Sequence, residues 1–154
     1  MTTAVKPIPD GYHSATPYLC VKDAARAIEF YKQAFGATES LRLADAGGTV
    51  RHAEIKIAGA PIMLADEFPD MNFRSPQSYG GSPVSLYVYV EDVDAFVDRA
   101  VAAGATLVRP VTDEFYGDRA GVVDDPFGHR WSFGTHREDV SPEELQRRFA
   151  AFCS

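Results

Sequence analysis

Cysteine is scarce in this sequence, and the two that occur stand far apart. Cys20 lies inside a strand-like run, and Cys153 is next to the last residue. A disulfide-stabilised extracellular scaffold needs several cysteines, so the count favours a reducing, cytoplasmic environment. The first residues contain no apolar signal-peptide core, and no apolar run approaches the roughly 20 residues that span a bilayer. We therefore expect a cytoplasmic protein with no membrane partner.

Positive charge is in the minority. Lysine and arginine number 15 against 22 aspartates and glutamates, which gives a formal net charge of −7 at pH 7. Proteins that bind nucleic acids use Lys and Arg to neutralise phosphates, so this balance argues against a nucleic-acid partner. At long range, the negative field would instead attract a cationic ligand.

Glycine-rich phosphate loops and nucleophile motifs are also missing. The doublets Gly47-Gly48 and Gly80-Gly81 stand in turn-like segments and match neither the dinucleotide-binding nor the P-loop pattern. No Cys-x-x-Cys pair and no Gly-x-Ser-x-Gly elbow occurs. The sequence therefore does not indicate a nucleotide-dependent enzyme, a thioredoxin-like protein or an α/β-hydrolase.

The sequence does contain one internal repeat. The chain has 154 residues, of which 45% are hydrophobic and 24% charged, as in a globular domain. Segments of the first half recur in the second, in the same order and at nearly the same spacing: 16–21 with 85–90, Asp23 with Asp92, 36–38 with 104–106, and 59–65 with 128–134. Four ordered matches indicate a duplicated module.

Each copy of the module is expected to fold as β-α-β-β-β. A run rich in β-branched and aromatic residues opens each copy as a strand, and Asp23 or Asp92 then caps a helix with apolar residues at helical spacing. Gly36 and Gly104 stand where the helix ends need a positive φ. The remaining strands are expected at about 38–44, 49–57 and 61–65, and at about 106–111, 121–123 and 129–134.

These modules are expected to form a single domain over residues 1–154. Module 1 covers about 14–66 and module 2 about 84–136. The stretch 67–83 between them is rich in Pro, Gly, Ser and Asn, which is typical of a linker or a lid.

The C-terminal segment carries the start signals of a helix over 141–152. Ser141 is the expected N-cap, Pro142 suits the first helical position, and Glu144 completes a capping box. The apolar residues that follow form one stripe, which we expect to pack on the body of the protein or on a partner chain.

Several segments resemble the vicinal oxygen chelate superfamily, which includes glyoxalase I, extradiol dioxygenases and bleomycin- and fosfomycin-resistance proteins. They are similar in particular to its PhnB-like branch, and they are VKDAARAIEFYKQAFGA, HAEIKI, IMLADE, FYGDRAGVVDDPFGHRW and THREDVSPEE. The resemblance implies an α+β fold in which two βαβββ modules form two concave sheets around one cavity. It also implies a homodimer.

The resemblance includes a test for a metal. In metal-binding members, His or Glu on the first and last strand of each module hold a divalent ion. Those positions are here Thr16, Met63, Ser85 and Ser132. Hydroxyls and a thioether are weak ligands for such ions, so we expect no cofactor at the usual metal site. A non-standard site built from His52, Glu54 and another histidine remains an alternative.

Polar residues on expected strands are candidates for chemistry. His52 and Glu54 alternate with apolar neighbours, so they are expected to face the cavity as an acid/base pair or as ligands. The alternative is a merely hydrogen-bonded strand face. Arg119 has the planar fork that binds carboxylates or phosphates. It could equally pair with a neighbouring aspartate, of which the candidates are Asp118, Asp124 and Asp125.

Tyrosines share strands with the former metal positions. Tyr18, Tyr87 and Tyr89 are expected to line an aromatic cavity that suits a planar or apolar ligand, together with Met63, Ser85 and Ser132. The alternative is that the rings simply fill the cavity. Trp131 is expected in the core, and His129 is expected in a turn with a backbone hydrogen bond.

These observations favour a small-molecule-binding protein without the usual divalent metal site. The alternative is a glyoxalase-like lyase or isomerase, or a dioxygenase, that uses a non-standard metal site or the acid/base pair His52 and Glu54. The expected partners are a small-molecule ligand and a second copy of the chain.

Overall fold

Two four-stranded sheets with related topology make up the protein. The computed structural model describes residues 4–154. The strand order is β1-β4-β3-β2 in one sheet and β5-β8-β7-β6 in the other. The first module consists of β1 (Tyr18–Val21), α1 (Ala24–Phe35), β2 (Thr38–Ala44), β3 (Val50–Ile57) and β4 (Ala60–Asp66). The second consists of β5 (Ser85–Tyr89), α3 (Val93–Ala102), β6 (Thr106–Asp113), β7 (Asp118–Asp124) and β8 (Arg130–His136). The expected α+β fold of two βαβββ modules is confirmed.

The N-cap signals in the sequence are confirmed. Each N-cap side chain accepts a hydrogen bond from a backbone N–H three residues later: Asp23 from Arg26 (3.2 Å), Asp92 from Ala95 (3.1 Å) and Ser141 from Glu144 (3.2 Å). The capping box expected from Glu144 was wrong, because its carboxylate pairs with Arg147 and Arg148 instead. Gly36 ends α1 with φ of 64°, a left-handed conformation that favours glycine.

The hairpin of β6 and β7 is longer than expected. β6 continues to Asp113 and β7 begins at Asp118, three residues before the expected start. The added residues are largely polar, and Asp113 pairs in register with Arg119. Such a segment shows no alternation of apolar and polar residues, so the pattern gave no signal of a strand there.

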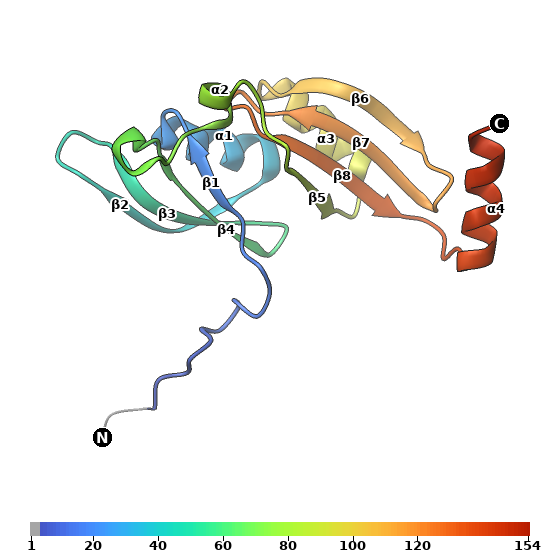
Figure 1. Cartoon of the computed structure of the whole chain (residues 1–154), viewed down its shortest axis with the longest axis horizontal. Helices are drawn as coiled ribbons and strands as arrows, with labels where there is room; N and C mark the ends of the chain where they lie inside the picture. Colours follow the sequence, from blue (N-terminus) through green and yellow to red (C-terminus); the bar gives the residue numbers. More distant parts are fainter. Residues whose placement is uncertain (1–3) are drawn as a thin grey trace.

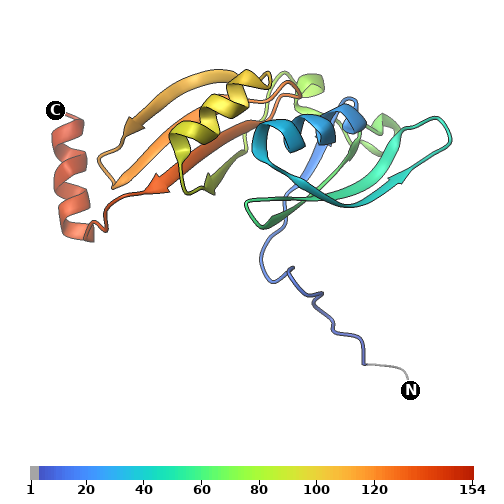
Figure 2. The ribbon, with the colours of Figure 1, turned by 180° about the vertical axis from the view of Figure 1, so that it is seen from behind.

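The two modules lie side by side rather than face to face. Helices α1 and α3 contact each other and cover one side of both sheets (Figure 2). The other faces of the two sheets open on the opposite side (Figure 1). The cavity that the resemblance implies is therefore divided within one chain into two open concave walls. Tyr18 is 46% exposed on one wall and Tyr87 is 45% exposed on the other.

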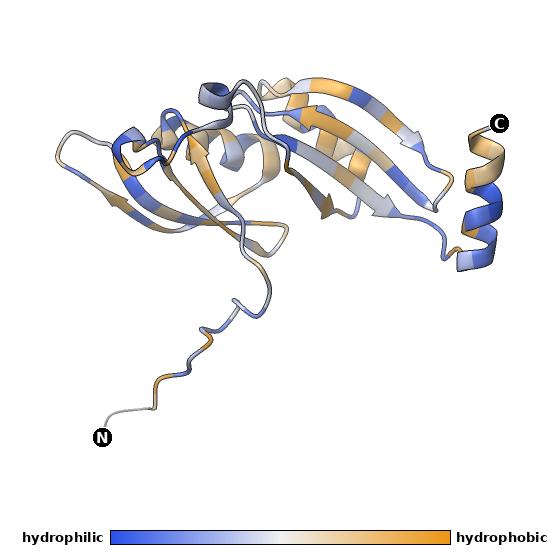
Figure 3. Ribbon diagram, viewed as in Figure 1, coloured by the Kyte–Doolittle hydropathy of each residue, from blue (hydrophilic) through white to orange (hydrophobic). Residues whose placement is uncertain are grey.

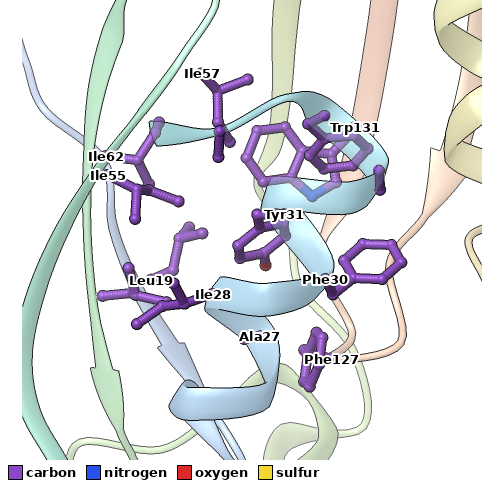
Figure 4. Close-up of a cluster of buried hydrophobic side chains, with 14 of the residues drawn as sticks. Leu19, Ala27, Ile28, Phe30, Tyr31, Ile55, Ile57, Ile62, Phe127 and Trp131 are labelled. Atoms are coloured by element: carbon purple, nitrogen blue, oxygen red, sulfur yellow. The ribbon is translucent and has the colours of Figure 1, made fainter. Parts of the chain in front are cut away.

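The core lies between the helices and the sheets. Ala53, Ile55 and Ile57 on β3 are fully buried on the helix side, whereas His52 and Glu54, which alternate with them, remain partly exposed on the concave side. This alternation follows from the two-residue period of a strand, and Figure 3 shows it along the ribbons. The close-up in Figure 4 shows aromatic rings of α1 beside rings from module 2.

A buried carboxylate joins the two modules. Oδ2 of Asp125 accepts hydrogen bonds from the Tyr31 hydroxyl of α1 (2.6 Å) and from the indole N–H of Trp131 on β8 (2.9 Å). Its Oδ1 accepts the backbone N–H groups of Phe127 (2.8 Å) and His129 (3.0 Å). The motif DPFGHRW thus folds a turn around Asp125 and ties it to the other module.

The connection between the modules is folded. It contains the short helices η1 (Pro69–Met71) and α2 (Pro76–Tyr79) and a bridge between Phe68 and Phe73. Glu67 anchors it, because this carboxylate accepts hydrogen bonds from the Ser75 backbone (2.7 Å) and the Ser78 hydroxyl. The hydrogen bonds from Ser75 and Ser78 lower the pKa of Glu67 to about 2, so the anchor stays ionised at neutral pH.

The C-terminal helix α4 (Pro142–Phe152) lies at the far end of module 2 (Figure 1). Its Phe149 and Phe152 rings contact Phe115, with centroids 5.9 and 5.3 Å away. Arg148 pairs with Glu138 (2.6 Å) in the segment that leads to the helix. Part of the expected apolar stripe thus contacts the body of its own chain, although no residue of α4 is buried and Phe149 and Phe152 remain exposed. None of the described helices has the length and apolar character needed to cross a membrane.

Candidate functional site

The concave wall of module 1 carries a hydrogen-bonded row of side chains. The Tyr18 hydroxyl lies 2.7 Å from Nδ1 of His52, and Nε2 of His52 lies 3.1 Å from Oε1 of Glu54. Oε2 of Glu54 accepts a hydrogen bond from the Tyr12 hydroxyl (2.8 Å). Since an ionised carboxylate only accepts, Nε2 of His52 donates to Glu54, and in the neutral imidazole Nδ1 then accepts from the Tyr18 hydroxyl.

This row keeps Glu54 ionised. Hydrogen bonds from His52 and then from Tyr12 lower the pKa of Glu54. The same contact with Glu54 raises the pKa of Tyr12, and burial raises the pKa of Tyr18. The phenols are therefore proton donors at neutral pH, and both oxygens of the carboxylate already have partners.

The concave wall of module 2 carries a second cluster, centred on the buried Asp118. Its Oδ2 accepts hydrogen bonds from the hydroxyls of Tyr87 and Tyr89, both at 2.8 Å. Its Oδ1 lies 2.8 Å from Nδ1 of His136, and the other ring nitrogen of His136 lies 2.7 Å from Asp139. The Tyr87 ring also lies against Gly134, where a Cβ atom would collide with its hydroxyl.

Asp118 is also held in the ionised form. Burial alone would raise its pKa, but the hydrogen bonds from His136, Tyr89 and Tyr87 together lower it. Burial and the contact with Asp118 raise the pKa of Tyr87. The pKa of His136 is raised by its hydrogen bonds to Asp118 and Asp139.

The contact between His136 and Asp118 makes a pH-dependent contribution to stability. Because the folded-state pKa of His136 is raised above its ordinary 6.5, this contribution is present below about pH 6.5 and is lost as the pH rises through the folded-state pKa. We expect the difference in Tm between the wild type and His136→Gln to shrink between pH 6 and pH 9, as measured by thermal unfolding.

The exposed partner of His136 supplies the control for that series. Asp139 is fully exposed, so Asp139→Asn is expected to retain most of the pH dependence. A difference between wild type and His136→Gln that stays constant across the range would contradict the assignment of the imidazolium to Asp118.

A hollow of about 620 Å³ lies at the edge of the module 1 wall. It is bounded by β1, β3, β4 and the connection between the modules. Its lining residues are Tyr18, Arg51, Ala65, Asp66, Phe68, Met71 and Phe73. Phe73 meets the Tyr18 ring edge-on, with centroids 5.7 Å apart. The hollow therefore adjoins the row of Tyr18, His52 and Glu54.

Comparison with known proteins agrees with this arrangement. A sequence profile of the Glyoxalase/Bleomycin resistance protein/Dioxygenase superfamily matches residues 12–133, which include both modules. The chain belongs to this superfamily. The superfamily fold thus accounts for the repeat, for the two strand orders and for the paired concave walls.

Relatives in this superfamily occur in bacteria and plants. An uncharacterized protein of Mycobacterium bovis, Mb0911c, is 46% identical over 134 residues, which are 85% of this chain and 88% of that protein. An uncharacterized protein of Arabidopsis thaliana, At5g48480, is 32% identical over 127 residues, which are 78% of this chain and 76% of that one.

Solved structures show the same fold. TioX from Micromonospora sp. ML1 matches with a TM-score of 0.63 and 32% identity over 80% of this chain and 99% of its own. The fosfomycin resistance protein FosX from Listeria monocytogenes matches with a TM-score of 0.60 and 18% identity over 86% of this chain and 96% of its own. At that identity FosX supports the fold alone.

The positions that hold a metal in metal-binding members of the superfamily do not suit one here. Of the four expected positions, Thr16 lies just before β1 and Ser85 begins β5 opposite Arg130, whereas register places Met63 opposite Tyr18 and Ser132 opposite Tyr87. The donor atoms at those levels are phenols, a thioether and a hydroxyl, which are poor ligands for a divalent ion. Among residues 4–154, no three His, Cys, Asp or Glu side chains are grouped so as to hold a metal.

Arg119 does not lie on the concave wall. Its guanidinium forms a bidentate ion pair with Asp94 of α3 (2.7 and 2.8 Å) and contacts Asp113 (3.2 Å) on β6. Since Asp94 lies on the helix side of the sheet, the arginine points away from the tyrosines. The alternative expectation, that Arg119 pairs with Asp118, Asp124 or Asp125, was also wrong. Each of these aspartates bonds other residues.

The other expected site residues fall on the concave walls. Tyr18, Met63, His52 and Glu54 share one wall, and Tyr87, Tyr89 and Ser132 share the other. Ser85 begins β5 opposite Arg130 and is exposed. His129 lies in the turn before β8, as expected, and its Nε2 donates a hydrogen bond to the backbone oxygen of Cys20 (2.9 Å). Burial raises the pKa of the Cys20 thiol to about 12, which makes that thiol unreactive.

Sequence reasoning missed three participants in these clusters. Tyr12 precedes the first strand and carries no periodic signal. Asp118 was considered only as a partner for Arg119, and no sequence pattern singled out His136. Tyr12 reaches Glu54 on β3, whereas the roles of Asp118 and His136 depend on contacts between β5, β7, β8 and the segment after β8. The fold brings these segments together.

Proposed function

We propose that this chain is a small-molecule-binding protein that acts without a divalent metal. The observation that carries the proposal is the state of the two wall carboxylates, Glu54 and Asp118. Each is held by phenol and imidazole donors, and the pKa of each is lowered. Half-exposed tyrosines surround them, which suits the binding of a ligand by aromatic contact and hydroxyl groups.

An acid/base enzyme is the second candidate, with His52 and Glu54 as the reacting pair. Their hydrogen bond, 3.1 Å long, favours it. A general base works best with a pKa near the operating pH, whereas the pKa of Glu54 is lowered. A binding protein is expected to keep its fold and most of its affinity in His52→Ala, whereas an enzyme of this kind is expected to lose turnover.

Ligand-induced thermal shifts with and without a chelator test the proposal. We expect aromatic compounds from a small-molecule panel to raise Tm equally in buffer with EDTA and in buffer with added Mn²⁺, Ni²⁺ or Zn²⁺. Metal content is measured in parallel by mass spectrometry on protein purified without chelator. Near-stoichiometric metal, or ligand shifts that vanish with EDTA, would contradict a metal-independent binder.

We also propose that two copies pair through their concave sides, so that each wall is covered. The supporting observation is the apolar surface left open there by Leu43, Tyr87 and Tyr89, which are 53%, 45% and 58% exposed. Exposed apolar patches of this kind are typical of interaction sites. The two free cysteines support a reducing, cytoplasmic location for this dimer.

A charge on the concave side is expected to separate the copies. Leu43 pairs in register with His52 on that side, so Leu43→Asp buries a carboxylate in the proposed interface. We expect it to sediment as a monomer at concentrations at which the wild type is a dimer. Leu107→Asp is the matched control, because Leu107 pairs with the buried Val123 and faces the helix side. Equal behaviour of the two variants would overturn the proposed interface.

A further inference from the structure

The hollow beside Tyr18 is a formed site with walls from two parts of the chain. Its inner wall is the sheet, at Tyr18 and Ala65, and its outer wall is the connection, at Phe68, Met71 and Phe73. Backbone hydrogen bonds between Phe68 and Phe73 (2.8 and 3.1 Å) fix the outer wall. A volume of about 620 Å³ falls within the roughly 300–1,000 Å³ of small-molecule sites.

The lining is mainly apolar and includes three aromatic rings. The Tyr18 and Phe73 rings meet edge to face. The Arg51 guanidinium lies over the Phe68 ring, with its carbon 5.0 Å from the ring centroid. Met71 at the tip of the connection is 74% exposed. A thioether side chain adapts to ligands of different shape. The body of a bound molecule is therefore expected to be flat and apolar.

Among the described polar side chains of the hollow, Arg51 keeps an N–H donor without a partner, whereas Asp66 and Tyr18 are already hydrogen-bonded. Both oxygens of Asp66 are engaged by backbone N–H groups, those of Ala24 (2.6 Å) and Val50 (2.7 Å). The Tyr18 hydroxyl is engaged with His52. Arg51 contacts Asp45 through Nε and Nη2 only. Within the described part of the chain, its Nη1 has no partner.

We infer that this hollow takes a planar aromatic ligand with an anionic oxygen group, such as an aromatic carboxylate, at the end that meets Arg51. This inference rests on the proposed small-molecule binding and names its ligand class. The ring system stacks among Phe68, Phe73 and Tyr18, and the carboxylate accepts hydrogen bonds from the guanidinium. The net charge of −7 does not select a cation here, because long-range fields are screened within about 8 Å at physiological salt.

Three naphthalene compounds that differ in charge test the ligand class: 2-naphthoate, 2-naphthylmethanol and 2-naphthylmethylammonium. Binding to the full chain is measured by isothermal titration calorimetry at one salt concentration. We expect the carboxylate to bind at least about tenfold more tightly than the ammonium, as charge-assisted hydrogen bonds do. Phe68→Ala is expected to weaken all three compounds, because it removes part of the aromatic wall.

Arginine variants locate the charge preference. Arg51→Met is expected to abolish the preference for the carboxylate. Arg109→Met is the matched control. Like Arg51, Arg109 is about half exposed and pairs with one carboxylate, that of Glu114, but it lies on β6, away from the hollow. It is expected to keep the tenfold preference.

Three results would overturn the ligand class. The first is equal binding of the ammonium and the carboxylate, the second is a preference unchanged in Arg51→Met, and the third is no binding by any naphthalene compound. If panel compounds shift Tm but no naphthalene compound binds, the ligand class fails and the proposed function stands. If neither the panel nor the naphthalenes bind, both fail.

Discussion

Asp125→Ala is expected to lower the free energy of unfolding by about 3–5 kcal/mol, because it leaves buried donors without their charged acceptor. The Asp125 side chain is buried, and its two oxygens accept four hydrogen bonds. Two of these come from Tyr31 and Trp131, which belong to different modules and are fully buried. Since water cannot reach these groups, nothing replaces the lost acceptor.

The measurement is urea or thermal unfolding at one fixed protein concentration, since association also shifts apparent stability. For a chain of this size, the loss corresponds to roughly 6–20 °C in Tm. Tyr31→Phe removes only the hydroxyl that links the modules and is expected to cost about 1–2 kcal/mol.

The neighbouring aspartate provides the control. Asp124 pairs with Arg130 at the surface, where both side chains are well exposed. Exposed pairs contribute about 0–1 kcal/mol, so Asp124→Ala is expected to change stability little. If Asp124→Ala and Asp125→Ala have equal effects, the buried carboxylate does not hold the modules together.

Gly117→Ala is expected to cost about 2–4 kcal/mol, because the methyl group meets backbone that cannot move aside. Gly117 has φ of +98°, and a Cβ atom there would collide with the backbone oxygen of Glu138. The carbonyl of Gly117 also accepts hydrogen bonds from the backbone N–H groups of Arg137 (2.9 Å) and Glu138 (3.0 Å). This turn therefore holds the segment that leads into α4.

Urea unfolding measures that loss, and hydrogen exchange followed by mass spectrometry locates it. We expect faster exchange over 137–152 in Gly117→Ala, with the sheet of module 1 unchanged. Gly59→Ala is the control, because Gly59 has a similar positive φ of +81° but no atom within 4 Å of a built Cβ. Its expected cost is about 1–2 kcal/mol from the backbone conformation alone. Equal losses in both variants would contradict the proposed collision.

The fold was largely predictable because its signals are local. Alternation along β3, helical spacing in α1 and α3, and cap residues such as Asp23 and Ser141 each act within a few residues. The repeat added a check between the two halves, since the same elements had to fit both. The start of β7 was missed because this local signal is absent there: the residues around Asp118 do not alternate between apolar and polar.

The site was predictable only in part. The tyrosines and the pair of His52 and Glu54 were placed on concave faces by strand alternation, which needs no partner strand. Whether the Arg119 side chain points to the concave side or to the helix side depends on the register of β6 and β7. That register is irregular, so the sequence could not give the side. A side chain at such a strand end has no periodic neighbours from which its direction follows.

The sequence by itself determined the two modules and most of their elements. These depend on residue identity and on short-range spacing. Only the tertiary structure decided that Asp118 gathers Tyr87, Tyr89 and His136, and that the connection between the modules walls a hollow with Phe68 and Arg51. Both arrangements join residues that are separated along the chain and meet only when the sheets form. Hydrogen bonding between such residues depends on strand register and on the exclusion of water, which the folded core sets.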